Sequence, residues 1–412
     1  MPGLNFETIQ TCRACGYEGI VDILDLGNHP LANSFVRSRE QEIHRFPLST
    51  AFCQKCFLFQ LKETIIKEIL FDHYFWVTGT AKGTHDYATV FAKRVCDWVG
   101  LRHQDFVIEI ASNDGTVLKQ FLALGMRVMG IEPAKNIVEI ALQKGVPTDC
   151  AYWDLACAKR IVSQYGRPKV VIARNVIAHV SDLHGAIKGI AEALSEDGVG
   201  VIEFHSGKVI AEELQYDSIY HEHLCYFTLH SFKNLLNKHG LFPFAIDKSP
   251  ISGGAIVVYF SKIERPLEAG YQEYLKEEDE GNINRQSTWE RFAQRAKEHR
   301  EKTIALLGNL NGQKIIGFGS SARGSTILNF CQIGKKNLQA IIDNNPLKQG
   351  WMVPAGDVPI VSLDQGLALQ PDFILLLAWN FSQEIINECD RRGYSGKYIM
   401  LFPKDPQIFS KR

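Results

Sequence analysis

The sequence predicts an α/β protein with three parts: a small four-cysteine zinc module, a doubly wound sheet domain and a second Rossmann-like domain at the C-terminus. Two pairs of closely spaced cysteines occur near the N-terminus, a strand-turn-helix-strand pattern begins at Phe106, and a similar pattern begins at Lys314. Strands that alternate with helical periods favour a parallel sheet covered by helices. A chain of 412 residues is also too long for one hydrophobic core.

Four segments follow from these patterns. A connector lies between the central domain and the C-terminal unit. Its apolar side chains around Trp289 and Phe292 keep helical spacing, so we expect the connector to dock as a helix. The predicted segments are a zinc-binding module over 1–65, a cofactor-binding domain with a helical lead-in over 66–262, a helical connector over 263–310 and the Rossmann-like domain over 311–412.

Composition narrows the class of partner. The chain has 45 basic and 46 acidic residues and no basic block interleaved with aromatics, which argues against nucleic acid. The first ten residues lack a secretory pattern, and the longest apolar run, Phe373 to Trp379, is too short to cross a bilayer. We therefore expect a cytoplasmic protein without membrane contact, in which cysteine spacing indicates metal binding before disulfides.

The cysteine spacing predicts a structural zinc site. Cys12 and Cys15 form one C-x-x-C knuckle, and Cys53 and Cys56 form another, so that four thiolates can surround one tetrahedral Zn²⁺. Four protein ligands leave no position for water or substrate, so this zinc should not be catalytic. The alternative is four unrelated reduced cysteines. The long segment between the knuckles should contain strands.

The turn after the strand Phe106 to Ile110 predicts a nucleoside site. Asn113-Asp114-Gly115 form the turn, and Glu132 ends the next strand about 20 residues on, where a doubly wound fold places the carboxylate that binds a ribose. The turn has one glycine and lacks the G-x-G-x-x-G pattern that lets a pyrophosphate approach the backbone. A cofactor with a ribose but no phosphate fits better; the alternative is an ordinary strand-turn-helix.

The run E-I-x-x-N-D-G followed by I-E-P resembles the cofactor loop of class I S-adenosylmethionine (AdoMet) methyltransferases. The resemblance implies that the central domain is a class I methyltransferase domain with AdoMet as its cofactor. The residues expected to hold or line the AdoMet site come from this loop, the next strand and the segment after Ala173: Glu109, Asn113, Asp114, Gly115, Glu132, Asn175 and His179.

The C-terminal unit repeats the strand-turn-helix pattern with a different glycine spacing. Gly317, Gly319 and Gly324 miss the dinucleotide fingerprint, so we expect a domain that holds part of the substrate or only packs. Ser320, Ser321 and Arg323, at the start of a helix, could bind a phosphate; the alternative is that they are ordinary surface residues.

Chemistry is expected in the segment Asp217 to Thr228, which follows a predicted strand. It contains two histidines, two carboxylates and two tyrosines. A histidine can accept a proton near neutral pH, and a tyrosine hydroxyl can donate to a developing oxyanion. The alternatives are a buried hydrogen-bonded network and a second metal site.

Taken in order, these features resemble the nucleotide-sugar C-methyltransferases of deoxysugar biosynthesis. The resemblance covers nearly the whole chain and includes Ser252-Gly253-Gly254 and the run Asp343 to Gly350. It implies an AdoMet-dependent C-methyltransferase that acts on a nucleotide-linked 4-keto deoxysugar, at the carbon beside the ketone. The rival possibilities are a family member acting on another small molecule, a zinc-containing RNA methyltransferase and a non-enzymatic binding protein. The oligomeric state stays open, a monomer included.

The same resemblance assigns the catalytic residues. His223 of the Y-x-E-H run is the expected base, Glu222 its orienting or charge-balancing partner, and Tyr220 or Tyr74 the donor to the enolate oxygen. The segment after Tyr74 departs from the family pattern, Y-x-Y followed by serines, because Trp76-Val77-Thr78-Gly79 stands there. The departure leaves methyl transfer in place and puts the identity of the sugar in doubt.

Overall fold

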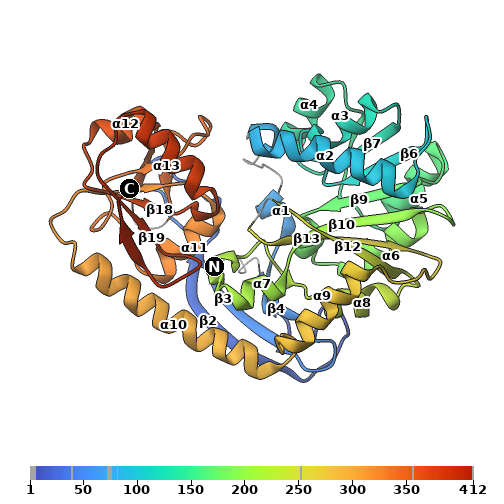
Figure 1. Ribbon diagram of the computed structural model, residues 1–412, viewed down its shortest axis with the longest axis horizontal. Coiled ribbons are helices and arrows are strands. Elements are labelled where there is room, and N and C mark those ends of the chain that lie inside the picture. Colours follow the sequence, from blue (N-terminus) through green and yellow to red (C-terminus); the bar gives the residue numbers. More distant parts are fainter. Residues whose placement is uncertain are drawn as a thin grey trace.

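The computed structural model describes residues 6–38, 40–71, 77–80, 82–250, 253–354 and 357–410. Four sheets organise these residues, and Figure 1 shows the central and C-terminal sheets side by side, with the N-terminal strands and the long helix α10 beneath them. Tyr74 and Ser252 lie outside the described residues. Among the helices described, none combines the length and the apolar character needed to cross a membrane.

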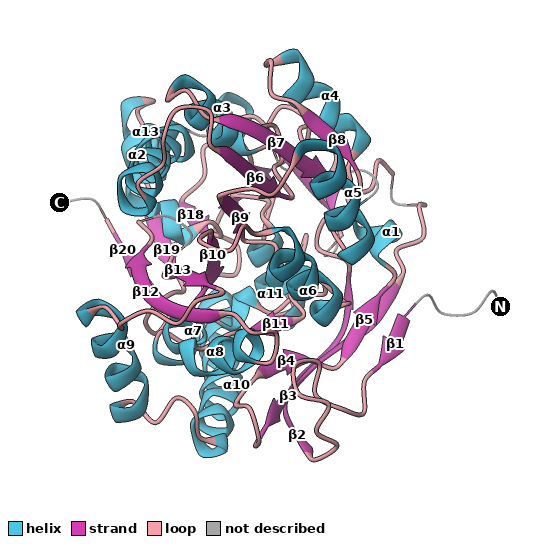
Figure 2. Cartoon of the chain, turned by 90° about the vertical axis from the view of Figure 1, so that its right-hand side faces the viewer, coloured by secondary structure: helices cyan, strands magenta, loops and turns pink. Residues whose placement is uncertain are grey.

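The N-terminal region is mostly β-structure, as the long segment between the cysteine pairs predicts. A four-stranded antiparallel sheet has the order β11-β4-β3-β2, and β1 pairs with β5 in a separate two-stranded sheet (Figure 2). The strands are β1 (Phe6–Thr8), β2 (Ile20–Pro30), β3 (Arg45–Cys53), β4 (Phe59–Leu61), β5 (Glu63–Ile65) and, from the central region of the chain, β11 (Cys225–Tyr226).

The central sheet has seven strands in the order β12-β13-β10-β9-β6-β7-β8. Its strands are β6 (Phe106–Ile110), β7 (Arg127–Glu132), β8 (Thr148–Cys150), β9 (Val170–Arg174), β10 (Val199–His205), β12 (Phe242–Lys248) and β13 (Ala255–Ser261). The chain runs from β6 outward to β8 and then returns to β9 on the other side of β6, so the switch point, where doubly wound sheets bind ligands, lies between β6 and β9.

The prediction of a parallel sheet is wrong for one edge of the central sheet. β13 runs antiparallel to β10, and β12 runs antiparallel to β13. These two strands are joined by a short connection at Gly253 and Gly254, which has no room for the crossover helix that a parallel pair needs. The five strands from β8 to β10 are parallel, as the sequence predicts.

Helices cover both faces of the central sheet, because the side chains of successive strand residues point to opposite faces and both faces are apolar. Val107 packs with α2 (Lys82–Val99) and α3 (Thr116–Ala123), whereas its neighbour Ile108 packs with α5 (Leu155–Tyr165) on the opposite face. The other elements of this region are α1 (Lys67–Phe71), η1 (Thr78–Thr80), α4 (Lys135–Gln143), η2 (Ile177–His179), α6 (Leu183–Ala193), α7 (Gly207–Glu212), η3 (Tyr216–Ser218) and α8 (Leu229–Asn237).

The connector is helical and docked. It forms α9 (Ala269–Glu280) and α10 (Gln286–Gly308), and α10 runs along the base of the molecule toward the C-terminal sheet (Figure 1). Trp289 is fully buried and stacks on Phe59 of β4 with a ring-centroid distance of 3.9 Å. The helical spacing therefore predicts this docking correctly, and α10 ties the C-terminal half to the N-terminal sheet.

The C-terminal sheet has the order β16-β17-β15-β14-β18-β19-β20, with parallel strands at its centre. It is a second Rossmann-like unit, as the repeated pattern predicts. The elements are β14 (Ile315–Phe318), α11 (Ala322–Phe330), β15 (Ile341–Ile342), β16 (Met352–Val353), β17 (Val358–Val361), α12 (Leu363–Ala368), β18 (Phe373–Leu376), η4 (Trp379–Phe381), α13 (Ser382–Arg391), β19 (Lys397–Met400) and β20 (Gln407–Phe409).

Candidate functional site

The turn between β6 and α3 requires left-handed backbone at Ala111, Asn113 and Gly115, whose φ angles are 49°, 50° and 73°. A side chain at Gly115 would also collide, because its Cβ would lie 2.8 Å from the side chain of Val146. Glycine is therefore needed at this position for conformation and for space. The result is a tight turn at the switch point of the sheet.

Glu132, at the end of β7, holds the two loops that flank the turn. Its Oε2 accepts a hydrogen bond from the backbone N of Asn113 at 2.9 Å, and its Oε1 accepts one from the backbone N of Ala134 at 3.0 Å. Each carboxylate oxygen has capacity for a second bond, so ribose hydroxyls could still be accepted. Burial raises the pKa of Glu132.

Glu109 of β6 is a buried side chain with an unpaired carboxyl oxygen. The side chain is 3% exposed, and within the described residues its Oε2 has no hydrogen-bond partner. Burial raises the pKa of Glu109 to about 8, with Arg174 opposing that shift. An unpaired carboxyl oxygen beside the switch point fits a cofactor that carries an ammonium group, as AdoMet does.

Asp114 and Asn113 hold η1 across the turn. The buried carboxylate of Asp114 forms an ion pair with Lys144 and accepts hydrogen bonds from the backbone N of Gly79 at 3.1 Å and the hydroxyl of Thr116 at 2.8 Å. The side-chain oxygen of Asn113 accepts from the backbone N of Thr78 at 2.8 Å. These contacts fix Thr78 and Gly79 of η1 onto the turn from Ala111 to Gly115, called the cofactor turn below, and direct contact of either side chain with AdoMet stays a prediction.

The segment after β9 reaches toward the Y-x-E-H run. Asn175 is exposed and has a left-handed φ of 51°, at the carboxyl end of β9 beside the switch point. The ring of His179 lies 4.7 Å from the ring of His223 at an interplanar angle of 89°. The structure thus groups His179, a predicted AdoMet residue, with the expected base.

His223 is held through both ring nitrogens. Its Nδ1 lies 2.9 Å from the carbonyl oxygen of Ser218, which can only accept, so Nδ1 carries the proton. Its Nε2 lies 2.6 Å from the hydroxyl of Tyr220 and therefore presents a lone pair to it. Burial moves the pKa of His223 well below its ordinary value, which keeps the imidazole neutral.

Glu222 faces away from this pair. Its Oε1 accepts a hydrogen bond from the side-chain amide of Asn33 at 2.6 Å, and Lys348 lies close enough to act on its charge. Burial raises the pKa of Glu222 to about 7. The orienting bond to His223 therefore comes from Ser218, and Glu222 instead joins the N-terminal sheet to the C-terminal domain.

The end of the Y-x-E-H run belongs to the N-terminal sheet. β11 pairs with β4, and the backbone N of Leu61 donates to the carbonyl of Leu224 at 3.0 Å. His221 is buried, with its Nε2 3.0 Å from the carbonyl of Pro47 on β3. The sheet that carries two of the zinc ligands thus anchors the segment that carries His223.

His205 was not predicted from the sequence. It ends β10, and its ring nitrogens lie 3.4 Å from the hydroxyl of Ser218 and 3.2 Å from the carbonyl of Gly253. Burial, together with the positive charge of Arg323, lowers the pKa of His205 to about 3. Its place at the carboxyl end of a strand in a doubly wound sheet is the sequence signal that could have identified it.

The C-terminal residues expected to bind a phosphate are otherwise engaged. Ser320 donates from its backbone N and its hydroxyl to Asp343, and Ser321 caps α11. Arg323 forms a bidentate ion pair with Asp217. Ser320 and Ser321 are therefore engaged within this second Rossmann-like unit and Arg323 by the central domain, and the phosphate hypothesis has no support from these contacts.

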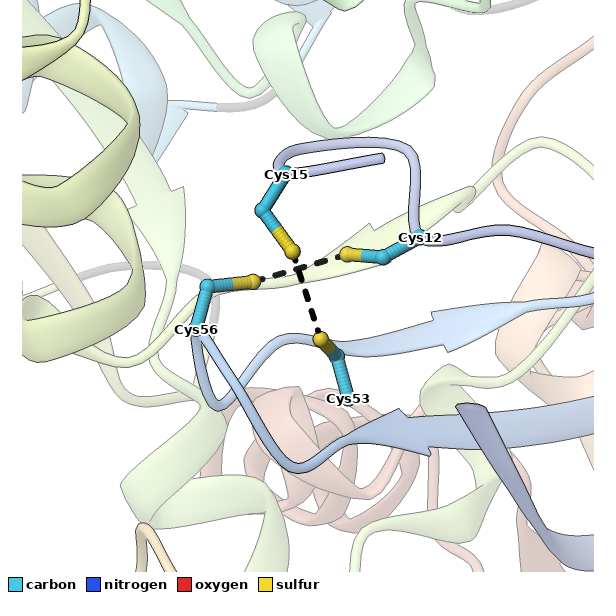
Figure 3. Close-up of side chains that lie close together, drawn as sticks. All are labelled: Cys12, Cys15, Cys53 and Cys56. Carbon is cyan, nitrogen blue, oxygen red and sulfur yellow. Dashed lines mark hydrogen bonds between the residues drawn. The ribbon is translucent and has the colours of Figure 1, made fainter. Parts of the chain in front are cut away.

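The four cysteines form one cluster (Figure 3). The sulfurs of Cys12 and Cys56 are 3.4 Å apart, those of Cys15 and Cys53 are 3.5 Å apart, and all four lie within 4.8 Å of one another. Hydrogen bonds from the thiols of Cys53 and Cys56 lower the pKa of Cys12. Four converging sulfurs fit a structural Zn²⁺.

Comparisons with known proteins assign the chain to known families. Three family models match it: a "Putative zinc binding domain" at residues 12–71, a "Methyltransferase domain" at 91–242 and a "C-methyltransferase C-terminal domain" at 250–403. The C-methyltransferase NovU of Streptomyces niveus is 31% identical over 409 residues, which cover 98% of this chain and 97% of that protein.

Solved structures match less than half of the chain. An S-adenosylmethionine-dependent methyltransferase from Clostridium acetobutylicum is 12% identical, with 43% of this chain and 91% of that chain covered and a TM-score of 0.36. The magnesium protoporphyrin IX methyltransferase of Synechocystis, solved with bound SAM, is 13% identical, with 42% and 79% covered and a TM-score of 0.33.

The match to NovU extends over all three regions, so it does not depend on the methyltransferase domain alone. The cysteine cluster, the switch-point turn and the second Rossmann-like unit are each accounted for by a matching family model. The chain therefore belongs to the C-methyltransferase family that includes NovU, and it joins a zinc-binding domain to a methyltransferase domain and a C-terminal domain.

Proposed function

We propose that this enzyme methylates a nucleotide-linked 4-keto deoxysugar at the carbon beside the ketone. The observation that carries the proposal is the pair formed by Tyr220 and His223, in which a neutral imidazole presents a lone pair beside a phenol hydroxyl. Carbon methylation next to a ketone needs these two functions, a base for the departing proton and a donor for the enolate oxygen.

His223 is the proposed base. The Ser218 carbonyl holds the proton on Nδ1, so Nε2 is the atom that accepts the proton from the substrate carbon. Burial keeps the ring neutral at physiological pH, and no proton has to be removed from it before the reaction. The same burial makes the imidazole a weaker base, so the departing proton must be acidified by stabilising the enolate.

Tyr220 is the proposed donor to the enolate oxygen. Its hydroxyl now donates to Nε2 of His223, and a rotation toward the substrate oxygen would free Nε2 and place a donor on the developing negative charge. Tyr74 is the other candidate donor. AdoMet, which Glu132 and the turn from Ala111 to Gly115 would hold, would supply an electrophilic methyl group for the substrate carbon. The fixed positions of this turn and of the Tyr220–His223 pair would supply the alignment of the two reactants.

A substrate other than a sugar is the second candidate, since the same base and donor would serve any small ketone. A zinc-containing RNA methyltransferase is disfavoured by the net charge of −1, because phosphate binding depends on clustered Lys and Arg. The neutral composition also agrees with an enzyme of the cytoplasm that binds neither nucleic acid nor membrane.

Mass spectrometry tests the proposal directly. Purified protein incubated with AdoMet and a panel of nucleotide-linked 3-keto and 4-keto deoxysugars should add one methyl group to a 4-keto substrate, on the carbon next to the ketone. Methylation of a non-sugar ketone with no turnover of any nucleotide-linked sugar would favour the second candidate.

A further inference from the structure

We propose that Arg323, in the C-terminal domain, is a positioning residue that holds His223 in its base form through Asp217 and Ser218. The inference rests on the proposed role of His223. It assigns the C-terminal domain a part in catalysis that requires no contact between Arg323 and the substrate.

Asp217 collects its hydrogen bonds from the C-terminal domain. Arg323 donates to its two carboxylate oxygens, from Nε and Nη2, at 2.9 Å each, and the indole Nε1 of Trp379 donates to Oδ2 at 2.8 Å. Asp217 is fully buried, and the Arg323 side chain is 15% exposed. A buried carboxylate without its cation would carry an uncompensated charge, so this pair fixes the position of the segment.

The contact reaches His223 through one peptide unit. Ser218 follows Asp217 directly, and its carbonyl oxygen accepts from Nδ1 of His223 at 2.9 Å. The direction of that carbonyl decides which ring nitrogen carries the proton and therefore whether Nε2 is free to accept one. Any displacement of Asp217 rotates the peptide that sets the tautomer.

Residues on either side of Asp217 and Ser218 are also held by the C-terminal half of the molecule, which includes α10 and α11. The hydroxyl of Tyr216 lies 2.9 Å from Nδ1 of His299 on α10, and the hydroxyl of Thr326 on α11 donates to the carbonyl of Ile219 at 2.8 Å. Together with Asp217, three of the four residues from Tyr216 to Ile219 are bonded to the C-terminal half. The remaining one, Ser218, is bonded to His223.

Electrostatics act in the same direction. The guanidinium of Arg323 adds to burial in lowering the pKa of His223 and of His205, because a nearby positive charge disfavours a protonated ring. Arg323 therefore helps to keep His223 neutral besides orienting it.

The test is Arg323→Met, with ring-nitrogen NMR of the ¹⁵N-histidine-labelled enzyme and steady-state kinetics as readouts. The His223 signals, identified by their absence in His223→Gln, should show Nδ1 protonated in the wild type and a mixture of tautomers in Arg323→Met. With a substrate identified by the panel, kcat should fall on the order of 10–100-fold, as for a displaced catalytic group, while the AdoMet dissociation constant changes less than twofold.

Arg295→Met is the matched control. Arg295 on α10 also crosses between the two halves, donating to the carbonyls of Ala211 and Glu212. Among the described residues it makes no hydrogen bond or ion pair with the segment from Tyr216 to His223. It should leave the His223 signals and kcat near wild-type values. If Arg323→Met fails to fold, Trp379→Phe removes only the indole donor to Asp217 and should shift the same signals in a milder way.

Unchanged His223 signals and kcat in a folded Arg323→Met, or unchanged signals in Trp379→Phe, would overturn the positioning role. The NMR measurement needs no substrate, so it tests the positioning role of Arg323 separately from the proposed role of His223 as the base. Perturbed signals in Arg323→Met combined with full methylation by His223→Ala would mean that the coupling exists but that His223 is not the base.

Discussion

The hydroxyl oxygen of Tyr220 lies 2.6 Å from Nε2 of His223, in a segment that is tied to both flanking parts of the molecule. Before the pair, Asp217 is bound by the C-terminal domain; after it, Leu224 and β11 join the zinc-bearing sheet. The proposed catalytic pair therefore depends on three regions folding together, and this dependence gives each region a separate experimental signature.

Loss of zinc should disable catalysis more than cofactor binding. Cys53→Ser removes one of the four ligands and should lower zinc from one per chain in elemental analysis. It should lower the midpoint of thermal unfolding of the N-terminal sheet and reduce turnover, because β11 pairs with β4 of that sheet. Calorimetry should show AdoMet binding largely retained. A metal-free protein with wild-type stability would contradict a structural zinc, and Cys150→Ser, at an exposed cysteine outside the cluster, is the control.

Glu132→Ala should weaken AdoMet binding by about 1–3 kcal/mol, the cost of losing hydrogen bonds to a charged group. The substitution removes the proposed ribose acceptor and the bond to the backbone of Asn113. Glu139→Ala, on the exposed face of α4, should leave the affinity unchanged. Equal affinities of wild type and Glu132→Ala in calorimetry would mean that the ribose binds elsewhere.

Gly79→Ala should lift η1 off the cofactor turn. A Cβ at Gly79 would lie 2.6 Å from Oδ2 of Asp114 and 2.8 Å from the hydroxyl of Thr116, so the segment must move by overpacking, at about 1–3 kcal/mol. We expect weaker AdoMet binding and a lower thermal midpoint. Gly83→Ala is the matched control, because nothing lies within 4 Å of its Cβ and alanine favours the helix. The same affinity in both variants would show that η1 does not shape the cofactor site.

Stability should fall as the pH drops below 6.5. Burial lowers the pKa of His179 and of His221 to about 4, His205 falls to about 3, and His223 lies well below its ordinary value. Between pH 6.5 and 4 the unfolded chain binds protons at these histidines that the folded chain does not, so unfolding becomes easier, by up to about 1.4 kcal/mol per pH unit for each histidine. Glu109 and Glu222 act in the opposite direction, because their raised pKa values let the folded chain keep protons that the unfolded chain releases. The histidines are more numerous and set the sign of the slope.

Urea unfolding at pH 7.5, 6.5 and 5.5 measures this slope. His179→Asn removes one of the four groups and should flatten it, whatever its effect on the absolute free energy of unfolding. A free energy of unfolding that stays constant or rises as the pH falls from 6.5 to 5.5 would contradict the lowered pKa values.

Local patterns in the sequence predict much of the fold. The C-x-x-C pairs, the turn from Asn113 to Gly115 and the helical spacing around Trp289 are short-range signals, and each appears in the structure as expected. The antiparallel edge formed by β12 and β13 was missed, since strand direction depends on the length of the connection between two strands that look alike in sequence.

The remaining differences between the predicted site and the observed site involve partners that lie far apart in the sequence. The partner of Glu222 is Asn33, 189 residues away, and the partner of Arg323 is Asp217, 106 residues away. No periodicity or motif encodes such pairs, because they depend on how three regions pack. The proximity of Tyr220 and His223 could be predicted, since they are three residues apart in one turn.

The most direct test of the central claim is hydrogen exchange at the carbon beside the ketone in deuterated water, with AdoMet omitted so that methyl transfer cannot occur. If Nε2 of His223 removes that proton, the wild type should exchange it, and Tyr220→Phe should exchange it more slowly. His223→Ala should lose exchange and methylation by roughly 10²–10⁴-fold, as expected for a missing general base, with AdoMet binding intact. Exchange and methylation by His223→Ala at near wild-type rates would contradict the account and assign the base to another group.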